Sequence, residues 1–286
     1  MLSIIICSRQ SALPDYTSNN IRETIGCDYE LIIVDNSSGD HNIFSAYNEG
    51  LKKTHGEFLC FMHEDVVFHS VNWGIKVESV FADHPETGMI GIVGGQFIPD
   101  TPCSYWEGGC SVGEMIQGSI GGDGKYQSVR EGKKVMELTD VVAIDGFWMC
   151  LRRDLFSKVY RDDKTYDGFH CYDIDISMQV WESGYKVQIV PDILIEHKSL
   201  GNTDSVYLEQ NQRFYEKWKD SLPVCRGLLL SEKEIEQRTA MVKYMRGYLD
   251  SFVKAERQLN SIRKSKAYRI GRAFLFPLRS LKPAKR

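Results

Sequence analysis

The sequence predicts an α/β fold with a parallel sheet at its centre, and three observations support this prediction. In the first 95 residues, short apolar runs rich in β-branched residues alternate with stretches of helical character. Polar residues follow where each apolar run ends. The chain has 286 residues, of which 42% are hydrophobic, so it can bury one large core, with or without an appendage. Alternating strands and helices build parallel sheets, which bind ligands at the carboxyl ends of their strands.

The elements of the first 95 residues place polar side chains at that edge. Apolar runs indicate buried strands at residues 2–7, 29–35, 57–62 and 89–93, and helical patterns lie at about 42–53 and 72–82. The first three strands end in Ser8-Arg9, Asp35-Asn36 and His63-Glu64-Asp65. We expect these end residues to line a ligand crevice.

Residues 94–140 are rich in glycine and lack a regular pattern. Such a segment in a compact domain usually forms a functional loop or lid, although a set of short strands explains it nearly as well. Regular character then returns as an apolar run, a helix, a strand and a second short strand, at residues 141–151, 173–183, 185–190 and 193–197.

Composition and motifs exclude several classes of protein. A chain this apolar is not disordered as a whole, and no apolar run approaches the ~18 residues that span a bilayer. The N-terminus lacks the basic region and the apolar length of a signal peptide. No P-loop motif occurs. Only a basic tail would favour a nucleic acid partner, so we expect none.

The eight cysteines form no CxxC pair, which disfavours a zinc ribbon or a redox motif. Cys7, Cys60 and Cys150 lie in apolar runs, where we expect buried thiols. Free thiols persist in a reducing compartment. The cysteine pattern therefore favours the cytoplasm and argues against export.

The C-terminal residues differ from the rest of the chain in charge. Nine of the 35 Lys and Arg residues lie in 263–286, which contain no acid, so the remainder carries 26 basic and 39 acidic residues. Phe and Leu residues are interleaved with the basic ones, a pattern typical of segments that lie in a membrane interface. We expect the tail to bind an anionic membrane surface from the cytoplasmic side. A solvated, frayed end is the alternative.

Residues 226–262 precede this tail and carry apolar residues at a seven-residue spacing. The pattern predicts a long amphipathic helix, interrupted by Arg238 and Glu256. Such a helix forms a homodimeric coiled coil or packs against the preceding domain, and the sequence leaves both open.

The strongest candidate site follows the third predicted strand. His63, Glu64 and Asp65 end an apolar run abruptly, at the edge where ligands are expected. Asp oxygen and His nitrogen both suit Mn²⁺, and Mg²⁺ prefers the oxygen. If the ligand is a sugar diphosphate, a divalent ion at this place would neutralise the charge that develops on the diphosphate when it leaves. A polar turn without a metal explains the triplet alone about equally well.

The order of the motifs resembles the family 2 glycosyltransferases, which have the three-layer GT-A fold. Four stretches carry the resemblance, namely residues 2–9, 29–38, 48–58 and 63–65. They resemble, in this order, the strand that lines the nucleotide pocket, the strand whose Asp contacts the base, the lead into the metal motif, and the DxD motif itself. The resemblance covers about residues 1–220. It rests on the order and spacing of motifs that are individually weak.

The resemblance implies a nucleotide-sugar site in the first 95 residues. Its expected members are Cys7, Ser8, Arg9, Asp35, Asn36, Asn48, His63, Glu64 and Asp65. His63 replaces the first Asp of the DxD motif, as in a subgroup of bacterial glycosyltransferase-like proteins. His197 matches a C-terminal His that can complete the metal site. The expected ligands of Mn²⁺ or Mg²⁺ are therefore Asp65, His197 and His63.

Residues 167–185 resemble the segment of the family that opens a helix with the catalytic base. Asp173 falls on the base position, and Tyr172 replaces the Glu that usually precedes it. An inverting transferase needs one general base beside the acceptor, and a helix N-terminus favours the ionised form of a carboxylate. We expect Asp173 to be that base. Helix capping alone is the alternative interpretation.

The acceptor half is expected in residues 140–220. Its expected members are Asp145, Gly146, Trp148, His170 and Asp175. Asp145 interrupts an apolar run, where a charge needs a reason. Trp148 and Trp106 could stack on a sugar face, although both residues are more often found in a core. For His170, a purely structural role is an equal alternative.

Together, the residues and the resemblance predict an inverting glycosyltransferase. The expected organisation is a GT-A domain at 1–225, an amphipathic helix at 226–262 and a membrane-binding tail at 263–286. We expect a uridine or deoxythymidine diphosphate sugar as donor, and a saccharide or lipid-linked acceptor in bacterial surface polysaccharide synthesis. Two alternatives are a nucleotidyltransferase, which would not need Asp173, and a membrane-docked protein that binds nucleotide sugars without turnover.

Overall fold

The computed structural model describes residues 1–121, 124–159, 162, 164–201 and 203–270. The chain divides into two compact units, Met1–Val242 and Lys243–Arg286. Residues 271–286 of the predicted membrane-binding tail lie outside the described part.

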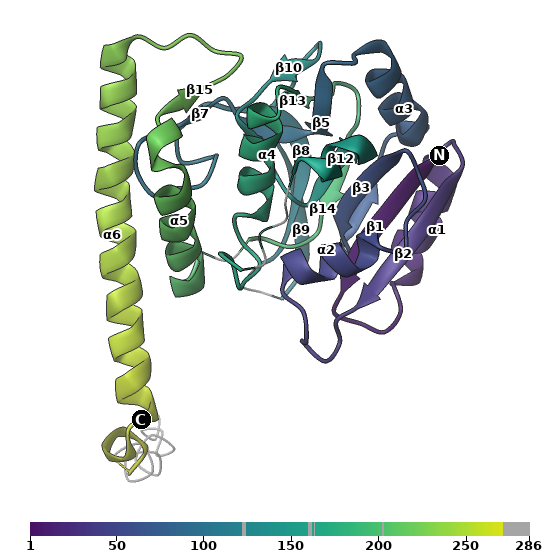
Figure 1. Cartoon of the computed structure of the whole chain (residues 1–286). Coiled ribbons are helices and arrows are strands. Elements are labelled where there is room, and N and C mark those ends of the chain that lie inside the picture. Colours follow the sequence, from purple (N-terminus) through teal and green to yellow (C-terminus); the bar gives the residue numbers. More distant parts are fainter. Residues whose placement is uncertain (122–123, 160–161, 163, 202, 271–286) are drawn as a thin grey trace, which may run out of the picture. The chain divides into compact units, whose positions relative to one another are not determined.

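A seven-stranded sheet forms the centre of the first unit, in the order β10–β13–β5–β12–β3–β1–β2 (Figure 1). In chain order its strands are β1 (Leu2–Ser8), β2 (Tyr29–Asp35), β3 (Phe58–His63), β5 (Thr87–Gly91), β10 (Thr139–Asp140), β12 (Trp148–Arg152) and β13 (Lys186–Ile189). β1 pairs in parallel with β2 and β3, as predicted, but β12 runs antiparallel between β3 and β5. The sheet is therefore mixed. β12 enters it from a tight turn, without the crossover helix that a parallel neighbour requires.

The glycine-rich segment belongs to a second sheet, ordered β11–β6–β8–β14–β4, with β9 paired to β8. These strands are β4 (Val66–Phe68), β6 (Val93–Gly95), β8 (Ser111–Ile120), β9 (Tyr126–Lys133), β11 (Ala143–Ile144) and β14 (Ile195–His197). A further pair joins β7 (Phe97–Ile98) to β15 (Val224–Cys225). The expected loop or lid at 94–140 is thus largely strands, as its alternative proposed. Residues 109–113 have the GxSxG spacing of hydrolases, but Ser111 begins a strand and opens no helix.

The helices of the first unit lie against these strands (Figure 1). They are α1 (Asp15–Thr24), α2 (Ile43–Leu51), α3 (Trp73–Asp83), α4 (Tyr172–Glu182) and α5 (Ser205–Trp218), with 3-10 turns η1 (Arg153–Ser157) and η2 (Lys219–Ser221). α2 packs on β1 and β2, and α4 packs on β5 and β13. Gly50 permits the close approach of α2, because a Cβ atom there would lie 2.4 Å from Ile5 Cγ2. Asn42 caps α2 by accepting a 2.8 Å hydrogen bond from Ser45 N.

Cys60 and Cys150 form a disulfide, which corrects the expectation of buried thiols at these positions. They lie directly opposite each other on the antiparallel strands β3 and β12, with their Cα atoms 4.2 Å apart. The sequence separates them by 90 residues, so no local spacing reveals the pair. Cys7 is a free, half-buried thiol, and burial raises its pKa to about 11. With one disulfide present, the cysteines no longer argue for a reducing compartment.

The predicted amphipathic helix is α6 (Glu232–Lys264), which begins in the first unit and continues in the second. It starts with a capping box, in which Glu234 accepts a 2.8 Å hydrogen bond from Ser231 N and donates its own N–H to Ser231 Oγ at 3.3 Å. Of the apolar residues at the seven-residue spacing, Met245, Phe252 and Leu259 are exposed, whereas Val242 is buried. Within the described residues, no helix combines the length and the apolar character needed to span a membrane.

Candidate active site

His63, Glu64 and Asp65 form the turn in which the chain passes from the first sheet to the second. His63 ends β3, and Val66 begins β4. β4 pairs antiparallel with β14, and its register sets Val66 opposite His197. This pairing brings His197 beside the turn, although 132 or more residues separate it from the triplet in sequence.

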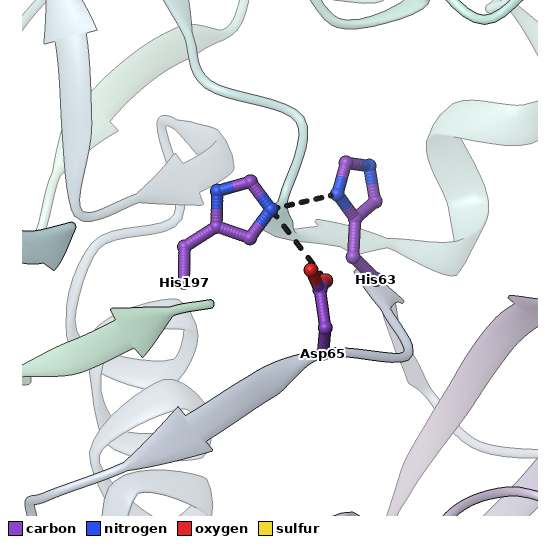
Figure 2. Close-up of side chains that lie close together, drawn as sticks. All are labelled: His63, Asp65 and His197. Carbon is purple, nitrogen blue, oxygen red and sulfur yellow. Dashed lines mark hydrogen bonds and ion pairs between the residues drawn. The ribbon is translucent and has the colours of Figure 1, made fainter. Parts of the chain in front are cut away.

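The two imidazoles and one carboxylate converge in space (Figure 2). His197 Nε2 lies 3.2 Å from His63 Nδ1 and 3.5 Å from Asp65 Oδ1. One ligand atom from each residue falls within 4.8 Å of the others. The three predicted metal ligands therefore form one group, with a nitrogen and oxygen donor set that suits Mn²⁺.

The electrostatics of the group prepare its members for a cation. Burial and the neighbouring His197 lower the pKa of His63 to about 4, so its imidazole is neutral at pH 7. Burial acts to raise the pKa of Asp65, but His197 and a hydrogen bond from Ser199 outweigh it and lower that pKa. A neutral imidazole and an ionised carboxylate are the protonation states that bind metal.

Two aromatic residues orient the imidazoles. The ring of His197 stacks on Phe147 at 5.0 Å between centroids and 11° between planes. His63 Nε2 lies 2.7 Å from the hydroxyl of Tyr172, the first residue of α4. A bond on the second ring nitrogen fixes the tautomer and direction of a ligating histidine. His63 and Tyr172 are both departures from the family pattern, and they contact each other directly.

Glu64, between the two ligands, is turned into the protein. It is 7% exposed and accepts hydrogen bonds from Ser8 Oγ at 2.6 Å, Arg9 N at 3.1 Å and Arg9 Nε at 2.9 Å. Ser8 is buried, whereas the Arg9 side chain is 79% exposed. Glu64 therefore joins the end of β1 to the metal turn, and Arg9 presents its remaining guanidinium nitrogens to solvent.

The remaining residues of the expected nucleotide pocket divide into exposed and internal groups. Asp35, at the end of β2, is exposed and accepts a 2.9 Å hydrogen bond from Ser37 N, which lowers its pKa. Asn36 is buried and exchanges two 2.9 Å hydrogen bonds with the backbone of His41. Asn48 is half-buried on α2. Asp35 is thus presented outward at the strand end, while Asn36 shapes the loop beneath it.

Asp173 lies in the first turn of α4, beside the turn that leads into β12. Its carboxylate accepts hydrogen bonds from Gly146 N at 3.1 Å and from Ile174 N at 2.9 Å. Burial and the neighbouring Asp145 nevertheless raise the pKa of Asp173 to about 7. The hydrogen bonds at the helix N-terminus favour the ionised form, as expected, but burial and Asp145 outweigh them. Its proton affinity instead suits a general base near neutral pH.

Gly146 allows α4 and this turn to meet. A Cβ atom at Gly146 would lie 2.3 Å from the Tyr172 ring, so any side chain would displace Tyr172. Asp145 accepts hydrogen bonds from Tyr105 OH at 2.5 Å and from Phe147 N at 3.1 Å. The turn 145–147 thus contacts both His197, through Phe147, and Asp173, through Gly146.

Residues 3–218 match the model of a family described as glycosyltransferase-like. The chain belongs to this glycosyltransferase-like family. The match covers most of the chain and confirms the resemblance and the enzyme class inferred from the sequence motifs. No curated protein matches the sequence significantly.

Comparison with solved structures confirms the GT-A fold of this glycosyltransferase. The structure of GalNAc-T7 with UDP, GalNAc and Mn²⁺ matches 77% of the chain with a TM-score of 0.51 and 14% identity. The chain spans 49% of that protein's length. Residues 1–349 of TarS from S. aureus match 84% of the chain and 70% of their own length, with a TM-score of 0.48 and 11% identity.

Replacing Tyr172 by Phe tests the contact between α4 and the metal group. Tyr172→Phe removes the oxygen that holds His63 Nε2, and loss of such a partner weakens metal affinity by about 10–100-fold. The change in Mn²⁺ affinity is measured from the melting temperature of the protein at increasing Mn²⁺ concentrations. Tyr47→Phe is the matched control, because Tyr47 packs edge-on against the Tyr172 ring and its buried hydroxyl has no hydrogen-bond partner in the described part of the chain. Equal Mn²⁺ affinity in Tyr172→Phe and wild type would contradict the prediction.

Two residues expected on the acceptor side lie in the core instead. Trp148 is fully buried and packs edge-on against Trp73 at 6.1 Å, because its strand β12 is central in the sheet. Asp175 is also fully buried and accepts hydrogen bonds from Tyr166 OH at 3.0 Å and Trp218 Nε1 at 2.7 Å. Neither side chain can touch an acceptor. The helical period turns Asp175 inward from Asp173.

Lys217 neutralises Asp175 and attaches α5 to α4. Its ammonium lies 2.9 Å from Asp175 Oδ1 and 3.1 Å from Asp162 Oδ2. Lys217→Met would leave the Asp175 charge buried without a cation, so we expect a loss of about 3–5 kcal/mol in unfolding free energy. Urea denaturation measures it. The exposed pair of Lys219 and Glu216 provides the control, since Lys219→Met should leave the unfolding free energy nearly unchanged. Equal losses in both variants would refute this role of Lys217.

The structure adds residues that the sequence did not single out. Tyr105 contacts Asp145, and Phe147 supports His197, across distances in sequence that carry no local signal.

His170 is half-buried, and its ring meets Tyr207 edge-on at 5.5 Å. Burial lowers the pKa of His170. Trp106 is 44% exposed, unlike the buried Trp148.

Proposed function

We propose that this protein is an inverting glycosyltransferase that uses Mn²⁺ or Mg²⁺ and a nucleotide-diphosphate sugar. The observation that supports it most directly is the connection between two groups. Three metal-competent side chains, His63, Asp65 and His197, lie at one strand end, and a single hydrogen bond joins them to the helix that carries Asp173. A metal-bound leaving group and a general base are the two parts that inverting transfer needs.

The donor set fits a divalent ion. Two imidazole nitrogens and a carboxylate oxygen face one another within 4.8 Å, and Tyr172 and Phe147 orient the imidazoles. His63, Asp65 and His197 would hold the ion. When bound, it supplies positive charge that neutralises the departing diphosphate.

Asp173 takes the acceptor proton in this proposal. The acceptor oxygen forms a bond to the anomeric carbon, the bond from that carbon to the diphosphate oxygen breaks, and the hydroxyl proton passes to Asp173. The hydrogen bond from Gly146 N holds the carboxylate in position. Asp145 keeps its proton affinity high enough for the transfer near pH 7.

We assign the donor nucleotide to the end of β1 and β2. Asp35 is exposed there and free to accept from a uracil or thymine ring, and the guanidinium of Arg9 is directed outward beside the metal turn. This arrangement supports a uridine or deoxythymidine diphosphate sugar as donor. The structurally similar GalNAc-T7 was solved with UDP and Mn²⁺.

Thermal melting with UDP, dTDP, GDP and their hexose conjugates, each with and without Mn²⁺, tests the proposal. Binding at a hundred times Kd stabilises the folded state by about 2.7 kcal/mol, a shift that is readily measured. We expect a shift that requires metal and is confined to one nucleotide family. Release of the nucleotide from the sugar, followed by chromatography, then separates an enzyme from a protein that binds without turnover. No shift with any donor in Mn²⁺ would refute the transferase proposal.

We further propose that the basic tail holds the enzyme on an anionic membrane, on its cytoplasmic face, where a saccharide or lipid-linked acceptor of surface polysaccharide is extended. Nine basic residues interleaved with Phe and Leu in 263–286 support this, since each basic residue near such a surface contributes about 1 kcal/mol. Co-sedimentation with vesicles of phosphatidylserine and phosphatidylcholine tests it. Full-length protein should pellet with mixed vesicles and not with pure phosphatidylcholine, and a chain ending at Asn260 should stay in solution with both.

A further inference from the structure

In the segment between β7 and β8, an exposed tryptophan stacks on a buried tyrosine of α5. Trp106 is 44% exposed, whereas Tyr207 beneath it is 3% exposed. The two rings are nearly parallel, with 5.7 Å between centroids and 17° between planes. Tyr105 meets Trp106 edge-on at 5.2 Å. A large aromatic surface is therefore open to solvent although its neighbours are packed.

Two separate chains of contacts join this tryptophan to the proposed base. In the first, Tyr105 donates to Asp145, and the next residue, Gly146, donates to Asp173. In the second, the ring of Tyr207 packs edge-on against the ring of His170. His170 precedes Asp173 by three residues and lies just before the N-terminal end of α4. These contacts connect the segment that carries Trp106 to the turn and the helix end that hold Asp173.

The segment that carries Trp106 is held in one conformation. Glu107 accepts hydrogen bonds from Ser104 N at 2.7 Å and from Tyr207 OH at 2.6 Å. Gly109 N donates to the carbonyl of Trp106 at 3.3 Å. Arg238 of α6 donates to the Gly108 and Gly109 carbonyls at 3.3 Å. A surface fixed before binding loses less entropy when it takes a ligand.

We propose that Trp106 is the stacking platform for the terminal pyranose ring of a neutral saccharide acceptor. This inference rests on the proposed transferase function and names the chemical class of its acceptor. The flat indole covers the apolar C–H face of a sugar ring and leaves the ring hydroxyls uncovered for other contacts.

The charges around the platform favour a neutral sugar over an acceptor phosphate. Asp145 and Asp173 lie at one end of the contact chains, and Glu107 lies beneath Trp106. Burial lowers the pKa of His170, and the charge of Asp204, at the N-cap of α5, acts in the opposite direction. Arg238 of α6 contacts this segment, and its guanidinium is directed to backbone carbonyls. A phosphate would meet acidic groups here, whereas a hydroxyl can donate to them.

Saturation-transfer NMR on the full chain with UDP and Mg²⁺, which is diamagnetic, tests the platform. The probes are methyl β-D-glucopyranoside, methyl β-D-galactopyranoside, methyl α-D-mannopyranoside and, as an anionic probe, sn-glycerol 3-phosphate. We expect at least one pyranoside to receive saturation on the C–H protons of one ring face. In Trp106→Ala its Kd should rise about tenfold or more, and Trp106→Phe should retain part of the affinity.

Two controls separate the outcomes. Trp181→Phe alters a half-buried tryptophan near the other end of α4 and should leave pyranoside affinity unchanged. Melting with the nucleotide donor and Mn²⁺ must be the same in wild type and Trp106→Ala; if wild type itself binds no donor, the transferase proposal fails before the platform is tested. With donor binding intact, absence of pyranoside binding, tighter binding of glycerol phosphate, or equal affinity in Trp106→Ala and wild type overturns the inference.

Discussion

Asp173→Asn should lower kcat by about 10²–10⁴-fold while leaving the affinity for the nucleotide donor unchanged. Asparagine preserves the shape and can still accept the hydrogen bond from Gly146 N, but it cannot take a proton from the acceptor. Initial rates of nucleotide release, with donor and acceptor each varied, separate the two effects. A nucleotidyltransferase would not need this carboxylate, so full activity in Asp173→Asn would favour that class instead.

The pH dependence of wild-type activity is a second test of Asp173 as the general base. Because the pKa of Asp173 is raised to about 7, its carboxyl group becomes protonated as the pH falls below 7. We expect kcat/KM to fall by roughly tenfold per pH unit on that acidic side, and Asp173→Asn should lack this limb. A flat profile from pH 5 to 8 in wild type would contradict the assignment of Asp173 as base.

The sign of the stability effect follows from the same shift. A carboxyl whose pKa is raised in the folded state favours folding most below its unfolded pKa, and this contribution is lost as the pH rises through about 7. The ionised carboxylate thus destabilises the fold at pH 8. Asp173→Asn should be at least as stable as wild type there, as measured by urea denaturation. A marked loss of stability would indicate a structural role for the carboxylate and would make the activity result ambiguous.

Asp65→Ala should abolish the stabilisation that Mn²⁺ adds to donor binding. Asp65 provides the carboxylate among the three grouped ligands, and without it only two imidazoles remain to hold the cation that offsets the diphosphate charge. The shift of about 2.7 kcal/mol expected for wild type at a hundred times Kd should fall to the value seen without metal. His197→Ala should act in the same direction, because His197 reaches the group from β14.

An exposed carboxylate outside the group serves as the control for Asp65. Asp192 lies in the turn before β14, with its side chain 65% exposed and 3.6 Å from Lys134. Asp192→Asn should keep the full metal-dependent shift, because an exposed ion pair of this kind contributes little. If Asp65→Ala retained the wild-type shift, the metal would have to bind elsewhere, and the proposed site would be wrong.

Several features of the fold were accessible from residue patterns. β1, β2 and β3 are short apolar runs, and such runs predict strands; β1 and β3 are buried, whereas the edge strand β2 is mostly half-buried. The antiparallel course of β12 was not accessible, because the pattern of an apolar run is the same in both directions. The pairing of Cys60 with Cys150 depends on that course and was missed for the same reason.

The sequence by itself determined the α/β class, the order of the motifs, and the residue types at the strand ends, because periodicity and local chemistry act over a few residues. Only the tertiary structure decided which of these side chains meet. The β4–β14 pairing brings His197 to Asp65, and α4 brings Tyr172 to His63 while turning Asp175 into the core. Such contacts join residues more than a hundred positions apart or depend on which face of a helix is covered. Side-chain direction and long-range pairing are properties of the packed chain, which no local pattern encodes.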